Sequence, residues 1–252
     1  MTTESKQNRR TFLKKSLAYS AGTLTIPTIL PSSVFAGSGR TMPGDRINLG
    51  FIGVGGMGTG HVRSFIEHDD VHVAAVCDVN RQHATRASDI VNKYNGDKAC
   101  TVFNDFRDLL ARSDIDAIVM AAPDHWHALI GQEAARMGKH MYYEKPLSRY
   151  FNESLEMRKA INNSGVVFQH GTQQRSDERF RFACELVRNG KLGNLEKIII
   201  ASASYSQVPV QPVEEVPDYL DYDLWLGPAP EVPYTSLRCS RTFTLIYDYS
   251  VG

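Results

Sequence analysis

The stretch Ile47-Asn-Leu-Gly-Phe-Ile-Gly-Val-Gly-Gly-Met-Gly-Thr-Gly60 decides the fold of the chain. It begins as an apolar run of strand length, and a polar, helix-compatible stretch follows as far as His68. Between them Gly53 allows a tight turn, Gly55 leaves space for a pyrophosphate beside the backbone, and Gly58 lets the helix lie close to the strand. The alternative is a glycine-rich surface turn. The context instead predicts that a dinucleotide binds at the helix N-terminus, through Gly53, Gly55, Gly56, Met57 and Gly58.

An acidic residue follows the next predicted strand at the spacing that a dinucleotide site requires. The strand Val71–Cys77 ends in Asp78, twenty residues beyond Gly58, where a carboxylate accepts hydrogen bonds from an adenosine ribose. A carboxylate there repels a 2′-phosphate, so we predict NAD as the cofactor. Because Arg81 partly offsets that repulsion, NADP is the alternative. The competing interpretation of Asp78 is a helix cap.

Strand and helix patterns then alternate along the chain, which is typical of parallel α/β folds. The apolar runs are short, as expected for strands buried between helices on both faces of a sheet. We predict a doubly wound Rossmann domain over residues 45–170. Its expected strands after the glycine turn are 71–77, 99–103, 115–122, 140–144 and 165–170, and its expected helices are 80–94, 105–112, 124–138 and 152–162.

Ligands of such sheets bind outside the carboxyl ends of the strands. Besides the glycine turn and Asp78, three strand ends carry chemistry-bearing residues on that edge. They are Ala122-Pro123-Asp124, Glu144-Lys145-Pro146 and His170-Gly171-Thr172-Gln173. The alternative for Lys145 is a Lys-Pro turn with a solvated ammonium.

The character of the chain changes after Gln174. A helix over about 177–189 is expected to pack Phe180, Ala183 and Val187 on one side, and strands are expected at 196–205 and 243–249. Residues 171–252 therefore predict the start of an α+β substrate domain with an incomplete antiparallel sheet. Tyrosine and tryptophan crowd this region, which suits either sugar stacking or packing in a core or a homo-oligomer interface.

The N-terminus is typical of a targeting segment. Arg9 and Arg10 form a twin-arginine pattern, a modestly apolar stretch follows, and Val34-Phe35-Ala36 has small residues at the positions of a cleavage site. We predict a signal peptide over 1–36, recognition by the twin-arginine export machinery and a periplasmic location. Because the stretch is interrupted by proline, serine and threonine, we expect no stable membrane anchor. A native protein whose mass matches residues 37–252 would confirm cleavage.

Charge and cysteine usage exclude several classes of partner. The formal net charge is zero, and residues 1–36 hold five basic side chains against one acidic one, so the remainder is mildly acidic. A mildly acidic protein has no general attraction for nucleic acid. The four cysteines form no C-x-x-C pair, which favours buried free thiols over a zinc site or a disulfide. His125 and His127 lie two apart on a predicted helix and make a poor chelate, so no metal site is predicted.

The motifs, in their order, resemble the Gfo/Idh/MocA oxidoreductase family. The resemblance rests on the glycine turn, Asp78, the Ala122-Pro123 turn with His127 beyond it, Glu144-Lys145-Pro146-Leu147, and the strand into Gln173. It implies hydride transfer between NAD or NADP and a hydroxyl carbon of a sugar or cyclitol. By the same resemblance Lys145 is the catalytic lysine, and Pro123, His127 and Glu144 line the nicotinamide end.

The sequence departs from the family pattern in its second domain. The family has a large open sheet there and a segment that supplies a catalytic histidine, and this chain stops before that segment is expected. We therefore expect a truncated chain. Two other hypotheses stay open: glycoside cleavage assisted by transient oxidation with tightly held NAD, and an inactive nucleotide-binding remnant.

Overall fold

The computed structural model describes residues 43–201 and 207–251. By compactness the chain divides into Met1–Pro43 and Gly44–Gly252, and the second unit carries the fold discussed below. The predicted signal peptide, residues 1–36, lies outside the described residues and stays a prediction. Within the described residues, no helix has the length and apolar character needed to cross a membrane.

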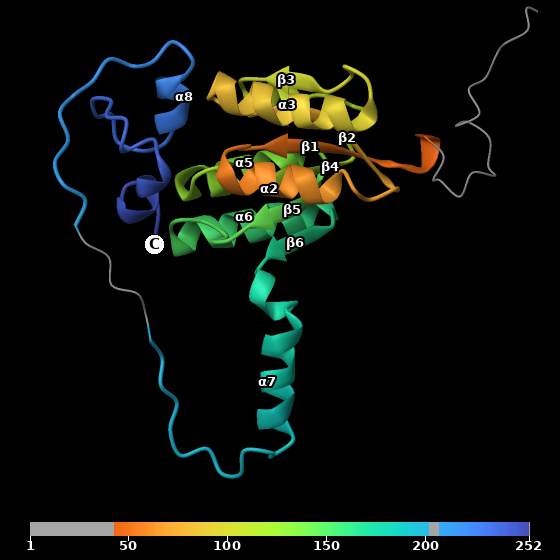
Figure 1. Cartoon of the computed structure of the whole chain (residues 1–252), viewed down its shortest axis with the longest axis vertical. Helices are drawn as coiled ribbons and strands as arrows, with labels where there is room; N and C mark the ends of the chain where they lie inside the picture. The colour runs from red at the N-terminus through yellow and green to blue at the C-terminus, as the bar shows by residue number, and fades with distance from the viewer. Residues whose placement is uncertain (1–42, 202–206, 252) are drawn as a thin grey trace, which may run out of the picture. The chain divides into compact units, whose positions relative to one another are not determined.

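Within the described residues the chain forms one parallel sheet of six strands, in the order β3-β2-β1-β4-β5-β6 (Figure 1). This confirms the predicted doubly wound α/β fold. The order reverses between β1 and β4, which is where the ligand crevice of such a sheet opens. The strands are β1 (Ile47–Ile52), β2 (Val71–Cys77), β3 (Thr101–Phe103), β4 (Ala117–Met120), β5 (His140–Glu144) and β6 (Phe168–Gly171).

Helices connect the strands and begin and end near the predicted positions. Asn80 caps the helix after β2 by accepting from the backbone N–H groups of Gln82 and His83, so the helix-cap interpretation of Asp78 is wrong. Left-handed Gly96 and Gly165 end two of the helices, as glycine commonly does. The helices are α2 (Gly56–Phe65), α3 (Arg81–Asn95), α4 (Phe106–Leu110), α5 (Asp124–Arg136), α6 (Phe151–Ser164), α7 (Glu178–Arg188) and α8 (Tyr222–Leu226), with short 3-10 turns η2 (Pro43–Asp45), η3 (Gln173–Arg175) and η4 (Arg241–Leu245).

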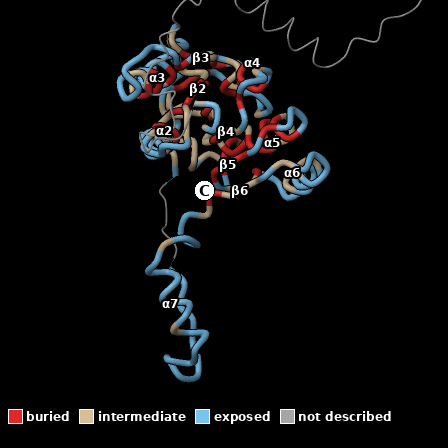
Figure 2. Tube along the Cα trace, turned by 90° about the vertical axis from the view of Figure 1, so that its right-hand side faces the viewer, coloured by how far each residue is buried: buried red, intermediate tan, exposed pale blue. Residues whose placement is uncertain are grey.

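The core lies on both faces of the sheet (Figure 2). On one face α2 and α3 pack Val62, Ala87 and Val91 against the strands. On the other face α4, α5 and α6 contribute Leu109, Ile130 and Met157. Fully burying a large apolar side chain stabilises a protein by roughly 1.5–3 kcal/mol, so these two layers hold the strand ends in fixed positions.

Two strands predicted in residues 171–252 are not found in the described residues. The expected strand at 243–249 is instead the end of the 3-10 turn η4 followed by a second turn at 247–249, because the Ser240 side chain accepts from the Thr242 N–H and starts η4. Residues 196–201 form no strand, and 202–205 lie outside the described residues. Strands need partner strands for their backbone groups, and the described residues supply none for these segments.

The predicted packing of α7 is also wrong. Phe180, Ala183 and Val187 are all exposed, and Phe180 is 54% accessible. The periodicity marks an apolar face, but within the described residues no buried cluster includes it.

Most of the aromatic residues near the C-terminus form a core of their own. Tyr222, Trp225, Tyr234 and Tyr249 are buried together with Leu220 and Leu226. Of the two predicted roles, packing is therefore the one that these four residues fill. The Tyr222 and Tyr234 rings meet edge to face at 5.2 Å, a geometry that aromatic pairs favour.

The cysteine prediction is wrong in one respect. All four thiols are free, and Cys77 and Cys100 are buried, but Cys184 is exposed. Burial raises the pKa of the Cys100 thiol to about 12, so this thiol stays protonated and packs as a small apolar group.

The contact between β1 and α2 gives a stability test. A Cβ atom on Gly58 would lie 1.9 Å from the Gly53 carbonyl oxygen, whereas one on Gly60 in the same helix meets nothing within 4 Å. We expect Gly58→Ala to lower the free energy of unfolding by roughly 1–3 kcal/mol or more, because the backbone must shift to relieve the overlap. The matched Gly60→Ala should cause no loss and a gain of up to about 1 kcal/mol. Urea unfolding measures both, and equal effects of the two substitutions would contradict the proposed close approach.

Candidate functional site

The glycine turn forms a concave backbone surface at the carboxyl end of β1. Gly53 has a φ of 77°, and a Cβ atom there would lie 2.5 Å from the backbone nitrogen of Ala122. Gly56 faces open space, with nothing within 4 Å of a Cβ position, and Met57 beside it is 53% exposed. The N-terminus of α2 therefore has the room and the free N–H groups that a pyrophosphate requires.

Asp78 is joined directly to this turn. Its Oδ2 accepts from the Val54 N–H at 2.8 Å and its Oδ1 accepts from the Asn80 N–H at 2.8 Å. A carboxylate has about four lone-pair positions, so each oxygen keeps capacity to accept a ribose hydroxyl. The structure thus brings Asp78 and the glycine turn together, as the spacing predicts.

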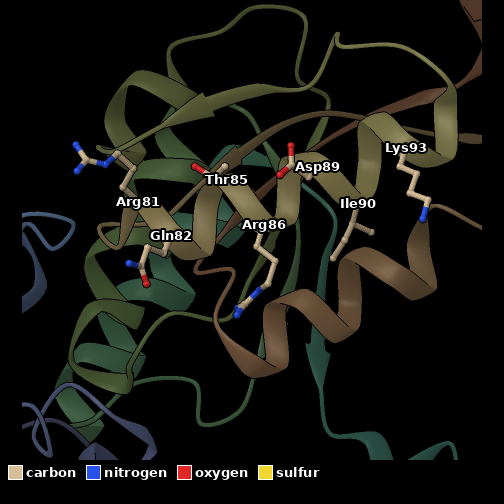
Figure 3. A pocket seen from close by; sticks show the side chains of 7 residues that line it. All are labelled: Arg81, Gln82, Thr85, Arg86, Asp89, Ile90 and Lys93. Carbon is tan, nitrogen blue, oxygen red and sulfur yellow. The ribbon is translucent and has the colours of Figure 1, made fainter.

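A groove of about 590 Å³ lies along α3, on the side toward α2 (Figure 3). Its lining includes three cations, Arg81, Arg86 and Lys93, and one acid, Asp89. Arg81 also donates to the Asp218 carbonyl oxygen at 3.3 Å, which restrains the guanidinium that the sequence offers to a 2′-phosphate. Of this set, the sequence pattern singles out Arg81, but it does not reveal the groove.

The turn at Lys145-Pro146, called the Lys145 turn below, follows β5 on the same edge of the sheet. Lys145 is exposed, its peptide bond to Pro146 is cis, and the Glu144 side chain beside it is only 5% exposed. Glu144 Oε1 accepts from His61 Nε2 at 2.7 Å and from Gln173 Nε2 at 2.6 Å. Burial opposes ionisation of Glu144 and raises its pKa. The hydrogen bonds from His61 and Gln173 outweigh that effect, so the pKa lies below the usual range.

His61 is a residue that sequence analysis missed. It lies on α2, one helical turn after Gly58, and residues three apart share a helix face. Since Gly58 must face β1, the sequence contained a signal that His61 also faces the sheet. Gln173, predicted as a cofactor-binding residue, meets the same carboxylate from η3.

His127 lies beneath the Lys145 turn rather than on its surface. The residue is 1% exposed, and its ring nitrogens face the carbonyl oxygens of Ala122 and Pro146. His127 therefore holds the two strand-end turns together, and its predicted place at the nicotinamide end stays a prediction. Pro123, at the N-cap position of α5, is half-buried at the end of β4.

The start of α5 anchors the C-terminal segment. The Asp124 carboxylate accepts from the Ser250 hydroxyl at 2.6 Å and from the Val251 N–H at 3.2 Å. His125 is buried, with Nε2 2.9 Å from the Trp225 carbonyl oxygen and its backbone N–H donating to the Tyr249 carbonyl. Sequence analysis did not foresee these long-range contacts, because nothing in the local pattern marks a partner about a hundred residues away.

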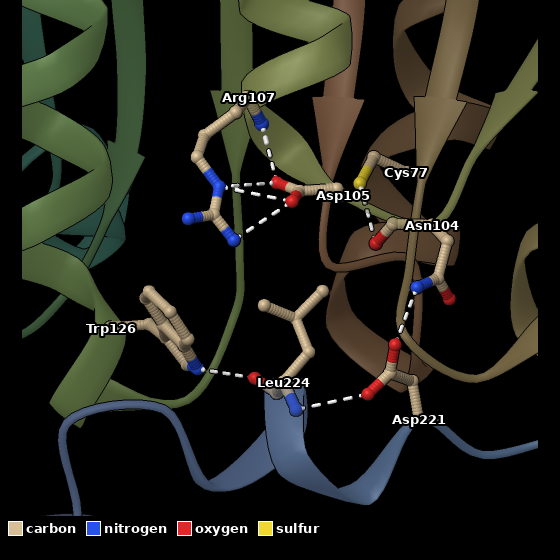
Figure 4. A network of polar contacts seen from close by, with 7 residues as sticks. All are labelled: Cys77, Asn104, Asp105, Arg107, Trp126, Asp221 and Leu224. Carbon is tan, nitrogen blue, oxygen red and sulfur yellow. Dashed lines mark hydrogen bonds and ion pairs between the residues drawn. The ribbon is translucent and has the colours of Figure 1, made fainter.

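A second set of contacts joins α8 to Asn104, which follows β3, and to Trp126 of α5 (Figure 4). Asp221 accepts from the Asn104 amide at 2.8 Å and from the Leu224 N–H, and Trp126 Nε1 donates to the Leu224 carbonyl at 3.1 Å. The Asp221 backbone N–H also donates to the Val79 carbonyl at 2.9 Å. Residues 219–221 therefore fix the loop that follows Asp78.

The ring nitrogens of His125 and His127 face backbone carbonyl oxygens. These nitrogens are therefore not free to ligate a metal ion. In the described part of the chain, no group of three or more potential metal ligands is present. The predicted absence of a metal site remains a prediction.

These features fit a dinucleotide. The open backbone at Gly56, the N-terminus of α2 and the part-free Asp78 carboxylate lie at one edge of a Rossmann sheet, beside the point where the strand order reverses. This arrangement defines a dinucleotide-binding domain. Lys145, Glu144, Pro123 and Gln173 lie at the same edge, and their functional roles stay predictions.

Comparison with known proteins identifies the family. Residues 47–172, half of the chain, match the oxidoreductase family with an NAD-binding Rossmann fold, Gfo/Idh/MocA. Residues 197–252 match the C-terminal alpha/beta domain of that oxidoreductase family. The chain therefore belongs to the Gfo/Idh/MocA oxidoreductase family, and NAD is the cofactor of its Rossmann domain.

Curated relatives and solved structures agree with this assignment. A glycosyl hydrolase family 109 protein of Shewanella baltica is 36% identical over 157 residues, which cover 56% of this chain and 34% of the relative. The uncharacterized oxidoreductase YrbE of Bacillus subtilis is 32% identical over 157 residues, covering 62% and 44%. The chain thus spans between a third and a half of these relatives.

Two inositol dehydrogenases have similar structures. Myo-inositol 2-dehydrogenase from Lactobacillus plantarum is 29% identical with a TM-score of 0.54, over 59% of this chain and 42% of that one. Scyllo-inositol dehydrogenase from Lactobacillus casei, solved with NAD(H) and scyllo-inositol, is 26% identical with a TM-score of 0.54, over 59% and 43%.

The two buried histidines predict acid sensitivity of the fold. Burial lowers the pKa of His125 and of His127 below the ordinary value near 6.5. As the pH falls below about 6.5, the unfolded chain takes up protons that the folded chain does not, so the free energy of unfolding falls by up to about 1.4 kcal/mol per pH unit for each histidine. Urea unfolding at pH 7.5, 6.5 and 5.5 measures this slope. His127→Asn should flatten it while exposed His68→Asn should not; an unchanged slope in His127→Asn would refute the assignment.

Proposed function

We propose that the protein transfers hydride between NAD and a hydroxyl carbon of a sugar-like or cyclitol-like substrate. The observation that carries the proposal is the exposed Lys145 amine at the same sheet edge as the glycine turn and Asp78. The inositol dehydrogenases of similar fold support the substrate class. NAD, when bound, supplies the hydride acceptor, and the protein supplies binding and orientation.

In this proposal, residues of the chain bind the cofactor and move the proton. The glycine turn and α2 hold the phosphates, and Asp78 holds the adenosine ribose. Oxidation of an alcohol releases a hydride from carbon and a proton from oxygen. In this proposal the Lys145 amine hydrogen-bonds that oxygen and accepts its proton, while the partners of Glu144 keep the turn in place.

Replacing the lysine separates binding from chemistry. Lys145→Ala should leave NAD affinity, followed by tryptophan fluorescence, within about threefold of wild type. Turnover of myo-inositol or scyllo-inositol, followed as NADH absorbance, should fall by at least about a hundredfold, the usual scale of a proton-transfer group. An equal loss of affinity and turnover would make Lys145 a cofactor anchor instead.

A second candidate is glycoside cleavage in which NAD oxidises the sugar transiently and returns the hydride. The similarity to a glycosyl hydrolase family 109 protein supports it. Oxidation of a ring hydroxyl to a ketone acidifies the C–H group next to it. Loss of that proton expels the glycosidic leaving group from the following carbon, water then adds to the resulting enone, and return of the hydride reduces the ketone. No NAD is consumed overall.

Chromogenic glycosides distinguish the two candidates. The hydrolytic route predicts that a panel of p-nitrophenyl glycosides releases p-nitrophenol at constant NADH absorbance, and that the release stops when bound NAD is removed. The dehydrogenase route predicts NADH formation from inositols and no p-nitrophenol release.

A further inference from the structure

His61 links the phosphate-binding helix to the Lys145 turn. It lies on α2, whose N-terminus is the glycine turn, and its Nε2 donates to Glu144 Oε1 at 2.7 Å across the carboxyl edge of the sheet. The side chain of His61 is 14% exposed, and its ring packs edge to face on Tyr142 of β5 at 5.5 Å. The ring orientation is therefore fixed by packing as well as by the hydrogen bond.

Both oxygens of the Glu144 carboxylate are engaged. Oε1 accepts from His61 and Gln173, and Oε2 accepts from the backbone N–H of Lys145 at 3.2 Å. Among the described residues, the Lys145 amine has neither an ion pair nor a hydrogen bond. The carboxylate next to the lysine in sequence is thus held away from its ammonium group.

We propose that His61 is a positioning residue that holds the Glu144 carboxylate off Lys145 and so keeps the lysine amine free. The catalytic meaning of that free amine rests on the function proposed above. Because His61 belongs to the helix that binds the phosphates, it also joins the position of the cofactor to the position of the lysine.

Removal of His61 should let Glu144 turn toward Lys145. An ammonium paired with a carboxylate loses its proton less readily, and an amine reacts with acylating reagents only when unprotonated. Exposed ion pairs are weak, so we expect the rate of Lys145 acylation in His61→Ala to fall about three- to fivefold. The rate is measured with N-hydroxysuccinimidyl acetate and peptide mass spectrometry, with exposed Lys93 as the internal reference.

Three matched variants define the experiment. His61→Gln should restore the wild-type rate, because its amide can also donate to Glu144. In a Glu144→Gln background, His61→Ala should change nothing, because no carboxylate remains to pair with the lysine. Arg63→Ala, on the exposed side of α2, should match wild type. Unchanged Lys145 reactivity in His61→Ala, or the same decrease in the Glu144→Gln background, would overturn the proposal.

Turnover gives an independent measurement. With inositols as substrates, His61→Ala should lower kcat about three- to fivefold, in step with the loss of amine reactivity, with little change in KM or NAD affinity, and His61→Gln should recover most of it. A loss confined to NAD affinity would overturn the proposal. If wild type turns over no alcohol, the proposed function fails, whereas the acylation rates still decide the role of His61.

Discussion

The close approach of α2 to β1 is the constraint on which the site depends. A side chain at Gly58 would overlap the Gly53 carbonyl oxygen, so the helix can lie this near only because the residue is glycine. This proximity points the N-terminus of α2 into the crevice at the switch point of the sheet. It also carries His61, about 7.5 Å further along the helix axis, to within hydrogen-bonding distance of β5.

The Glu144 carboxylate shows how tertiary structure sets the charge state of a strand-end acid. Burial to 5% exposure opposes ionisation, but donors from α2, from η3 and from the following backbone N–H favour the charged form and lower the pKa. A buried charge is tolerated when its lone pairs are satisfied. Glu144 can therefore stay ionised next to the exposed Lys145 without forming an ion pair with it.

The sequence was sufficient for the sheet and for the edge that carries the site. Apolar runs bounded by turn residues located each strand, and the parallel topology then placed Gly53, Asp78 and Glu144 at one edge. Local pattern cannot show which side chains meet across that edge. The pairing of His61 with Glu144 joins residues 83 positions apart and depends on how two elements are rotated about their axes.

The same limit explains the errors beyond the sheet. The apolar face of α7 and the apolar run at 196–201 indicate burial, but burial requires a partner surface that a local pattern does not specify. For residues 243–249 the sequence predicts a strand, yet Ser240 and Thr242 favour a turn through local hydrogen bonds. Of the aromatic residues there, Tyr249 is fully buried in a cluster built from turns, whereas Tyr247 is exposed.

The C-terminal segment is fixed at two places to the sheet edge that carries the glycine turn. Residues 219–221 pair with the loop after Asp78, while Ser250 and Val251 bind the Asp124 carboxylate at the start of α5. Backbone groups in both places find partners in the Rossmann domain rather than in water. Order in the C-terminal segment therefore depends on the Rossmann sheet beneath it. The loop that positions Asp78 depends in turn on the C-terminal segment, so the nucleotide site is built from both parts of the chain.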